Sequence, residues 1–239
     1  MRNSKSILIV GVGGLGVAAA LAIARAQYVA RIGLIDPDPV ELTNLHRQVI
    51  YSACDIGRPK VEAAARHLRE IDHELDIEAF PLALDADNAR AIVARFDFII
   101  DGTDNPATKF LINDVALASA TPFAYGGVLG MSGQAMTVIP HRTACMRCLF
   151  EDEPEAAEVA SCREAGILGP IAGAIGYLQA REALAILEHR MPTLAGAIVT
   201  YHATASPRVR LTQVSPRNGC LCGAYQGNIS KDDQALARR

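Results

Sequence analysis

A glycine-rich segment follows a short run of branched apolar residues near the start of the chain. It reads Gly11-Val12-Gly13-Gly14-Leu15-Gly16 and comes directly after residues 7–10. Glycines in such a turn let the backbone approach a phosphate, and the following helix N-terminus offers free N–H groups. Asp36 ends the next predicted strand, where a carboxylate could accept hydrogen bonds from a ribose. The pattern predicts nucleotide binding by Gly11, Gly13, Gly14, Gly16 and Asp36, without distinguishing NAD from ATP.

A dense group of polar side chains follows Asp36. Arg47 could donate to phosphate as a fork and Lys60 as a point charge, so the two could neutralise a triphosphate. The residue types alone leave a second interpretation equally open, a solvated loop held by salt bridges. The candidate phosphate-binding group consists of Asp38, Asn44, Arg47, Gln48 and Lys60, with Glu41 beside them.

Two aspartates lie where another predicted strand ends, in the segment Asp101-Gly102-Thr103-Asp104-Asn105. Open α/β sheets bind ligands at the carboxyl ends of their strands, and a carboxylate there could hold Mg²⁺ against phosphate oxygens. We interpret Asp101 as the cap of a turn and Asp104 as the magnesium-binding residue.

Four cysteines form two close pairs that are distant in sequence, Cys145-x-x-Cys148 and Cys220-x-Cys222. Four thiolates make a closed tetrahedral site for structural zinc, which would pin the C-terminal segment to the rest of the fold. The alternative is a set of free buried cysteines. Metal ligands are favoured because two close pairs rarely arise by chance in a protein without disulfides.

The order of the predicted elements indicates how these residues are positioned. Strands are predicted at residues 7–10, 31–36, 77–81, 96–101 and 123–127, with helices at 14–26, 59–71, 86–94 and 106–120. This alternation is typical of a doubly wound, mainly parallel sheet. Beyond residue 130, strands at 134–139, 197–202 and 209–214 and a long apolar helix at 170–189 predict a partly antiparallel extension.

The expected fold is therefore α/β and Rossmann-like, with a partly antiparallel extension and a zinc-binding segment. We predict a single domain over residues 1–223, with a nucleotide-binding core at about 6–130 and an extension at about 131–223. Residues 224–239 are expected to form a flexible tail.

Composition excludes several classes of function. The net charge is −3 and no block of Lys or Arg stands out, so nucleic acid is not expected as a partner. The N-terminus lacks the pattern of a signal peptide, and the apolar stretch at 167–180 is too short to span a bilayer. We expect a cytoplasmic protein that does not bind membranes.

The joint occurrence and order of these motifs resemble the ThiF/MoeB/HesA family, bacterial relatives of ubiquitin-activating enzymes. The motifs are Gly11–Gly16, IDPDPVELTNLHRQ (residues 35–48), GRPK (57–60), DGTDN (101–105), CMRCLF (145–150) and CREAGILGP (162–170). The resemblance extends from residue 7 to about residue 223. One departure is the second cysteine pair, which has one residue between the cysteines where the family usually has two.

The resemblance implies an adenylyltransferase that uses ATP, Mg²⁺ and Zn²⁺. The glycine segment and Asp36 would hold ATP, the phosphate-binding group would line its phosphates, and Asp104 would hold Mg²⁺. The C-terminal glycine carboxylate of a small ubiquitin-like sulfur-carrier protein ending in Gly-Gly would attack the α-phosphate and release pyrophosphate. A homodimer is implied as well. Cys162 would either take part covalently, with Arg163 lowering its pKa, or be a bystander.

Three alternatives to this enzyme are weighed against the sequence. Family members commonly carry an N-terminal helical segment whose arginines reach the nucleotide of the other subunit, whereas here only Arg2 precedes the first predicted strand. This favours a degenerate relative that binds nucleotide or carrier as a scaffold or heterodimer partner. An NAD-dependent oxidoreductase rests on the glycine segment alone. A tRNA-directed dehydratase of the same wider family is disfavoured by the missing basic patch.

Overall fold

A computed structural model describes residues 3–150, 152–153 and 166–223 of the chain. Its strands are β1 (Asn3–Val10), β2 (Val29–Ile35), β3 (Asp76–Phe80), β4 (Phe98–Asp101), β5 (Phe123–Leu129), β6 (Ser132–Val138), β7 (Ala197–His202) and β8 (Val209–Gln213). Its helices are α1 (Gly14–Ala26), α2 (Lys60–Ile71), α3 (Ala89–Val93), α4 (Pro106–Ser119), α5 (Met146–Phe150) and α7 (Gly169–Leu187), with short 3-10 helices at Leu42–Asn44 and Ala53–Asp55.

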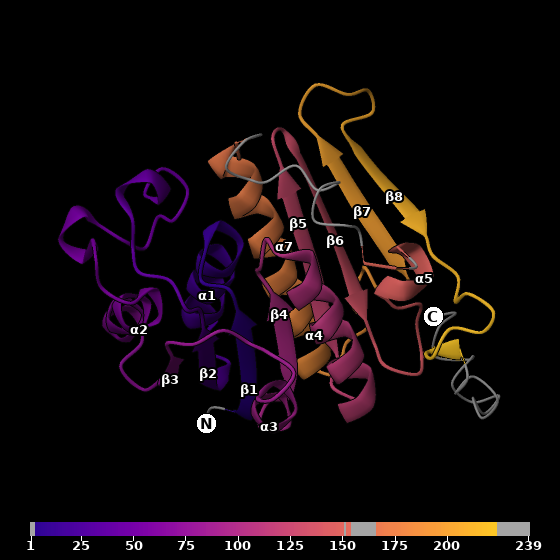
Figure 1. The fold of residues 1–239 in the computed structure, drawn as a ribbon, viewed down its shortest axis with the longest axis horizontal. Coiled ribbons are helices and arrows are strands. Elements are labelled where there is room, and N and C mark those ends of the chain that lie inside the picture. Colours follow the sequence, from indigo (N-terminus) through magenta and orange to yellow (C-terminus); the bar gives the residue numbers. More distant parts are fainter. Residues whose placement is uncertain (1–2, 151, 154–165, 224–239) are drawn as a thin grey trace.

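In the described part of the chain, the strands form one eight-stranded sheet in the order β3-β2-β1-β4-β5-β6-β7-β8 (Figure 1). Strands β1 to β5 run parallel, whereas β6, β7 and β8 are added antiparallel. The strand order reverses between β1 and β4, which is where doubly wound sheets open a ligand-binding crevice. This confirms the predicted Rossmann-like fold with its antiparallel extension.

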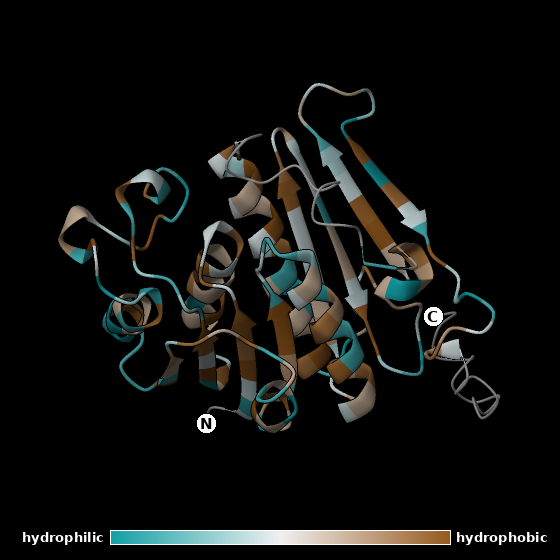
Figure 2. Ribbon diagram, in the orientation of Figure 1, coloured by the Kyte–Doolittle hydropathy of each residue, from teal (hydrophilic) through white to brown (hydrophobic). Residues whose placement is uncertain are grey.

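Helices lie on both faces of the parallel part of the sheet (Figures 1 and 2). On one face, Ile7 and Ile9 of β1 pack in a cluster with α1, α2 and α7. On the other, Leu8 and Val10 pack in a cluster with α3 and α4. A strand buried on both faces must be apolar at every position, which explains the unbroken run at residues 7–10.

The predicted elements differ from the observed ones mainly at their ends. Strand β1 begins at Asn3 rather than Ile7, since it continues to pair with β2 through Ser6. Helix α2 begins at Lys60, with Pro59 as its N-cap. The 3-10 helices and α5 are only three to five residues long, too short to show a hydrophobic period in the sequence. The predicted tail at 224–239 lies outside the described residues.

Candidate functional site

A cavity of about 1120 Å³ opens at the carboxyl ends of the parallel strands. It extends from the glycine segment across the ends of β4 and β5 to β6 and β7 of the antiparallel extension. All but one of the residues predicted to bind nucleotide or magnesium line it: Gly11, Gly13, Gly14, Asp36, Asp38, Asn44, Arg47, Gln48, Lys60 and Asp104. The fold thus gathers residues that are up to 93 positions apart, from 11 to 104, around one space.

The backbone of the glycine segment passes tightly between neighbouring strands. Gly11 has a φ of +84°, a conformation that L side chains rarely adopt. A Cβ on Gly16 would lie 1.9 Å from the carbonyl oxygen of Gly11, so only glycine fits where α1 begins beneath the turn. Gly16 is the predicted residue that does not line the cavity, and its observed place is in the packing under the loop.

Asp36 is almost fully buried and fastens this turn to the end of β2. Its carboxylate accepts from the backbone N–H of Val12 at 2.7 Å and of Asp38 at 2.9 Å. Burial raises the pKa of Asp36 above its ordinary value, and the Lys60 ammonium partly offsets that rise. The carboxylate therefore holds the loop in place by hydrogen bonds, and it also lines the cavity that a ligand would enter.

Lys60 is held by carboxylates in this structure. Its Nζ lies 2.8 Å from Asp38 and 3.5 Å from Asp36, and its side chain is only 6% exposed. Lys60 thus forms salt bridges, but it is buried rather than part of a solvated loop. An ammonium has three N–H donors, so two carboxylate contacts leave one for a phosphate.

Arg47 and Gln48 lie beside the glycine segment, since a Cβ on Gly14 would lie 3.6 Å from the Arg47 Cγ and one on Gly13 3.7 Å from the Gln48 Nε2. The Arg47 Nη2 donates to the Asn44 side chain at 2.8 Å, and Nη1 lies 3.5 Å from the Thr43 carbonyl oxygen and 3.4 Å from the His46 ring. These contacts orient the guanidinium on the cavity wall. Gln48 is 3% exposed, and its Oε1 atom has no hydrogen-bond partner in the described structure. A buried amide oxygen without a donor is costly, and this one can accept a hydrogen bond from a hydroxyl or amino group of a ligand in the cavity.

The two aspartates of the DGTDN segment have different surroundings. Asp101 is fully buried, accepts from the backbone N–H and hydroxyl of Thr103, and forms an ion pair with Lys109 at 2.9 Å. It therefore caps the turn, as predicted. Asp104 is exposed on the cavity wall, and Asn105 rather than an aspartate caps α4.

Several cavity residues belong to no motif and were not predicted from the sequence. Lys109 on α4, Tyr125 on β5 and Gln134 on β6 line the region between the glycine segment and the extension. Leu82 and Leu84 line the cavity beyond β3, whose last residue, Phe80, accepts a hydrogen bond from the Asp36 N–H at 3.3 Å. Their apolar side chains suit a flat ring. Spacing could not identify these residues, because only the pairing of β4, β5 and β6 brings the first three together.

The four predicted cysteine ligands converge at one point. Their sulfur atoms all lie within 4.8 Å of one another, with Cys145 3.5 Å from Cys220 and Cys148 3.1 Å from Cys222. Zinc–sulfur bonds of about 2.3 Å imply sulfur–sulfur separations of about 3.8 Å around a tetrahedral ion. The donor set and its spacing fit a zinc ion, and the shortened Cys-Leu-Cys pair does not prevent the convergence. Burial raises the pKa of Cys145 to about 12.

Of the two remaining cysteines, only Cys54 belongs to the described residues, and it is not part of this cluster. Cys54 is exposed, and Cys162 lies outside the described residues. No helix in the described ranges is long and apolar enough to cross a membrane.

Comparison with known proteins identifies the family to which the chain belongs. The ThiF family profile matches residues 1–222. The chain is 37% identical over 224 residues to the "Sulfur carrier protein adenylyltransferase" of Thermus thermophilus, covering 91% of this chain and 82% of that protein. It is 35% identical to "Adenylyltransferase and sulfurtransferase MOCS3" of Culex quinquefasciatus, covering 95% of this chain and 51% of that protein. The chain spans about half the length of the MOCS3 relatives from three mosquitoes, from 45% to 51%.

Solved structures share the fold at lower identity. The E. coli MccB structure with ATP has a TM-score of 0.79 at 20% identity, covering 95% of this chain and 68% of that one. At this identity the likeness concerns the fold alone. The family profile covers nearly the whole chain and the adenylyltransferase of Thermus thermophilus is related over most of its length, so this protein belongs to the ThiF family.

Proposed function

We propose that this protein adenylates the C-terminal glycine carboxylate of a small ubiquitin-like sulfur-carrier protein, using ATP and releasing pyrophosphate. The observation that carries the proposal is the cavity that places Arg47, Lys60 and Asp104 beside the glycine segment. The names of related adenylyltransferases support the reaction class, and those of sulfur-carrier and small-protein activating enzymes support the substrate class.

In the proposed reaction, the glycine segment holds the triphosphate against its N–H groups and Asp36 orients the ribose. One carboxylate oxygen of the carrier attacks the α-phosphorus while the bond from that phosphorus to the bridging oxygen of pyrophosphate breaks. No general base is required, because a terminal carboxylate is already ionised at neutral pH. Arg47 and Lys60 stabilise the charge that builds up on the leaving pyrophosphate.

The residues present suit both proposed metals. Asp104 and Asp152 are exposed carboxylates on the cavity wall, and Mg²⁺ is typically held by one or two carboxylates together with phosphates and water. Asp104 would hold the ion, which supplies further neutralisation of phosphate charge. The four cysteines would hold Zn²⁺ in a structural role, since all four ligands come from the protein and leave no open position.

The proposed partners are the carrier, with a Gly-Gly terminus, and a second copy of the chain. Large apolar side chains are exposed around α7 and β8, including Tyr177, Val209 and Leu211, each more than 50% exposed. Exposed apolar surface of this kind is typical of protein interfaces. A homodimer therefore remains our proposal for the assembly.

The test is ATP–pyrophosphate exchange with a panel of purified ubiquitin-like carriers that end in Gly-Gly. Carrier-dependent exchange is expected, and Asp104→Ala should reduce it by about 100-fold or more. Asp87→Ala is the matched control, because Asp87 is also an exposed aspartate but does not line the cavity. Undiminished exchange in both Asp104→Ala and Lys60→Ala would refute the assignment of the site.

The same assay separates the enzyme from a scaffold. A scaffold would bind ATP or carrier and show no exchange with any member of the panel. The Gln48 oxygen, which can accept from a nucleotide hydroxyl or amino group, and the Arg47 guanidinium on the cavity wall favour a site that still receives a nucleotide. Tight binding of NAD without affinity for ATP would instead support the oxidoreductase alternative.

A further inference from the structure

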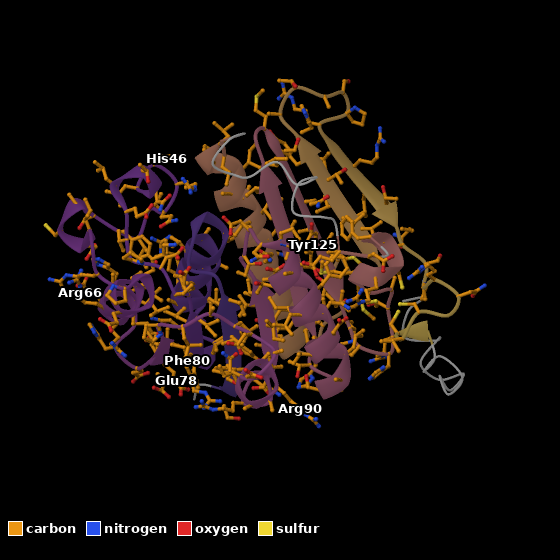
Figure 3. The ribbon with its side chains drawn as sticks, in the orientation of Figure 1. His46, Arg66, Glu78, Phe80, Arg90 and Tyr125 are labelled. Atoms are coloured by element: carbon orange, nitrogen blue, oxygen red, sulfur yellow. The ribbon has the colours of Figure 1, made fainter. Side chains whose placement is uncertain are left out.

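Three side chains from neighbouring elements meet on the floor of the cavity. The Nζ of Lys109 donates to Asp101 at 2.9 Å and to the carbonyl oxygen of Gly126 at 2.6 Å, and it lies 5.0 Å from the centre of the Tyr125 ring. The Gln134 Nε2 donates to the Tyr125 hydroxyl at 2.5 Å. Helix α4 and strands β4, β5 and β6 are thus joined at one point, near the Tyr125 label in Figure 3.

This group has hydrogen-bond donors that the described residues do not use. Lys109 has three N–H donors and two acceptors, Asp101 and Gly126. The Tyr125 oxygen receives the hydrogen bond from Gln134, and its own proton has no acceptor among the described residues. Burial, and then the nearby Asp101 carboxylate, raise the pKa of Tyr125, so its hydroxyl keeps that proton at neutral pH.

The position of these donors within the cavity indicates what they receive. Lys109 is bonded to Asp101, which precedes Gly102, and a Cβ on Gly102 would lie 2.7 Å from the carbonyl oxygen of Gly11. The donors therefore adjoin the glycine segment that receives phosphate. In the other direction, Gln134 pairs with Thr200 of β7, so the cavity continues over the antiparallel strands. The group lies between the two halves of the cavity.

Charge favours an anionic group as the occupant. Asp101 is 0% exposed, so the Lys109 ammonium is the charged atom of this pair that a ligand can reach. A carboxylate accepts up to about four hydrogen bonds and matches an ammonium and a phenol better than a neutral carbonyl does. Resting on the function proposed above, we infer that Lys109 and Tyr125 form the subsite for the terminal carboxylate of the carrier protein.

In this arrangement one carboxylate oxygen accepts from Lys109 and Tyr125 while the other faces the α-phosphorus. When the second oxygen bonds to phosphorus, the bond to pyrophosphate breaks and the first oxygen becomes the carbonyl oxygen of the acyl-adenylate. Lys109 and Tyr125 keep their protons throughout. Their role is to bind and orient the nucleophile, which accounts for part of the rate gain in a bimolecular reaction.

The test compares binding of one carrier in two forms, with its natural C-terminal carboxylate and with a C-terminal amide. The carrier is the one that supports the highest exchange in the panel, and affinity is measured by calorimetry. Tyr125→Phe removes the hydroxyl and retains the ring. Lys109→Met is combined with Asp101→Asn, so that no buried charge is left unpaired and Thr103 keeps its acceptor.

The wild type should bind the carboxylate form at least about tenfold more tightly than the amide form. A hydrogen bond to a charged group contributes enough binding free energy for about this change in affinity. Each variant should lose most of that preference, while its affinity for ATP and its melting temperature stay near those of the wild type. Tyr28→Phe is the control, because its hydroxyl bonds to Leu187 and does not line the cavity.

Two results overturn the proposal in distinguishable ways. If wild-type exchange depends on the carrier and both variants keep the full preference for the carboxylate, the subsite is wrong and the proposed function stands. If the wild type binds ATP but no carrier supports exchange, the proposed function fails and the subsite falls with it.

Discussion

Replacing Lys60 by Met should destabilise the protein far more than the same replacement at Lys5. Both lysines lie 3.5 Å from an aspartate oxygen, Lys60 from Asp36 and Lys5 from Asp97. Their burial differs greatly. The side chains of Lys60 and Asp36 are 6% and 7% exposed, whereas those of Lys5 and Asp97 are 30% and 37% exposed.

The expected magnitudes follow from this difference. Two unit charges 3.5 Å apart attract by about 5 kcal/mol at an effective dielectric constant of about 20. Removing one partner of a buried pair typically costs about 3–5 kcal/mol, because the other charge stays desolvated. A solvent-exposed pair is worth about 0–1 kcal/mol, since water and salt screen it. Methionine keeps the apolar stem at both positions, so the contrast isolates the charge.

The loss at Lys60 should depend on pH. Burial holds the pKa of Asp36 above its ordinary value, and removing Lys60 should raise it further. A carboxyl group with a raised pKa binds its proton more tightly in the folded state, so its penalty is present above that pKa and disappears below it. Urea unfolding should therefore show a larger loss at about pH 7.5 than at about pH 5.

An equal loss of unfolding free energy at the two pH values would refute this reasoning. So would a loss at Lys60 no larger than that at Lys5. Either result would mean that Asp36 is solvated well enough to stay ionised without its partner.

Two further predictions concern the loop and the cysteine cluster. Gly16→Ala should lower the free energy of unfolding by about 3 kcal/mol, because its Cβ would meet a backbone oxygen at 1.9 Å. Gly13→Ala should have a melting temperature near that of the wild type, since its Cβ would meet only the Gln48 side chain at 3.7 Å. Equal melting temperatures for the two variants would contradict this prediction. Purified protein should contain about one zinc ion per chain, and Cys148→Ser should lose it while Cys54→Ser should not. A zinc content near zero in the wild type would end the zinc assignment.

Much of the fold could be predicted because its information is local. The apolar run at residues 7–10, the glycines after it and the amphipathic helices each have a period or a turn residue that the sequence displays. The beginning of β1 could not be predicted from side-chain alternation. Asn3 and Ser6 are polar, and they belong to the strand because the backbone of β2 lies beside them.

Some residues of the candidate site could be predicted from the sequence and others could not. Arg47 and Lys60 are predicted from their charge and the motifs in which they lie, and Asp104 from its place after a predicted strand. The ion pairs of Lys60 could not be predicted from the sequence, because Asp36 and Asp38 could equally have faced solvent. Lys109 and Tyr125 are single residues without a motif, and only the pairing of β4 with β5 places them together.

The cysteine cluster and the cavity are connected through α4. Arg147, between the first two cysteines, donates to Asp114 of α4 at 2.8 Å and stacks over the Phe110 ring at 4.9 Å. Phe110 lines the cavity and follows Lys109 directly. A metal ion that fixes the cysteine segment would therefore also fix the side of α4 from which Lys109 reaches the end of β4. A zinc ion held by the four cysteines would in this way support the part of the cavity wall that contains the proposed Lys109 and Tyr125 subsite.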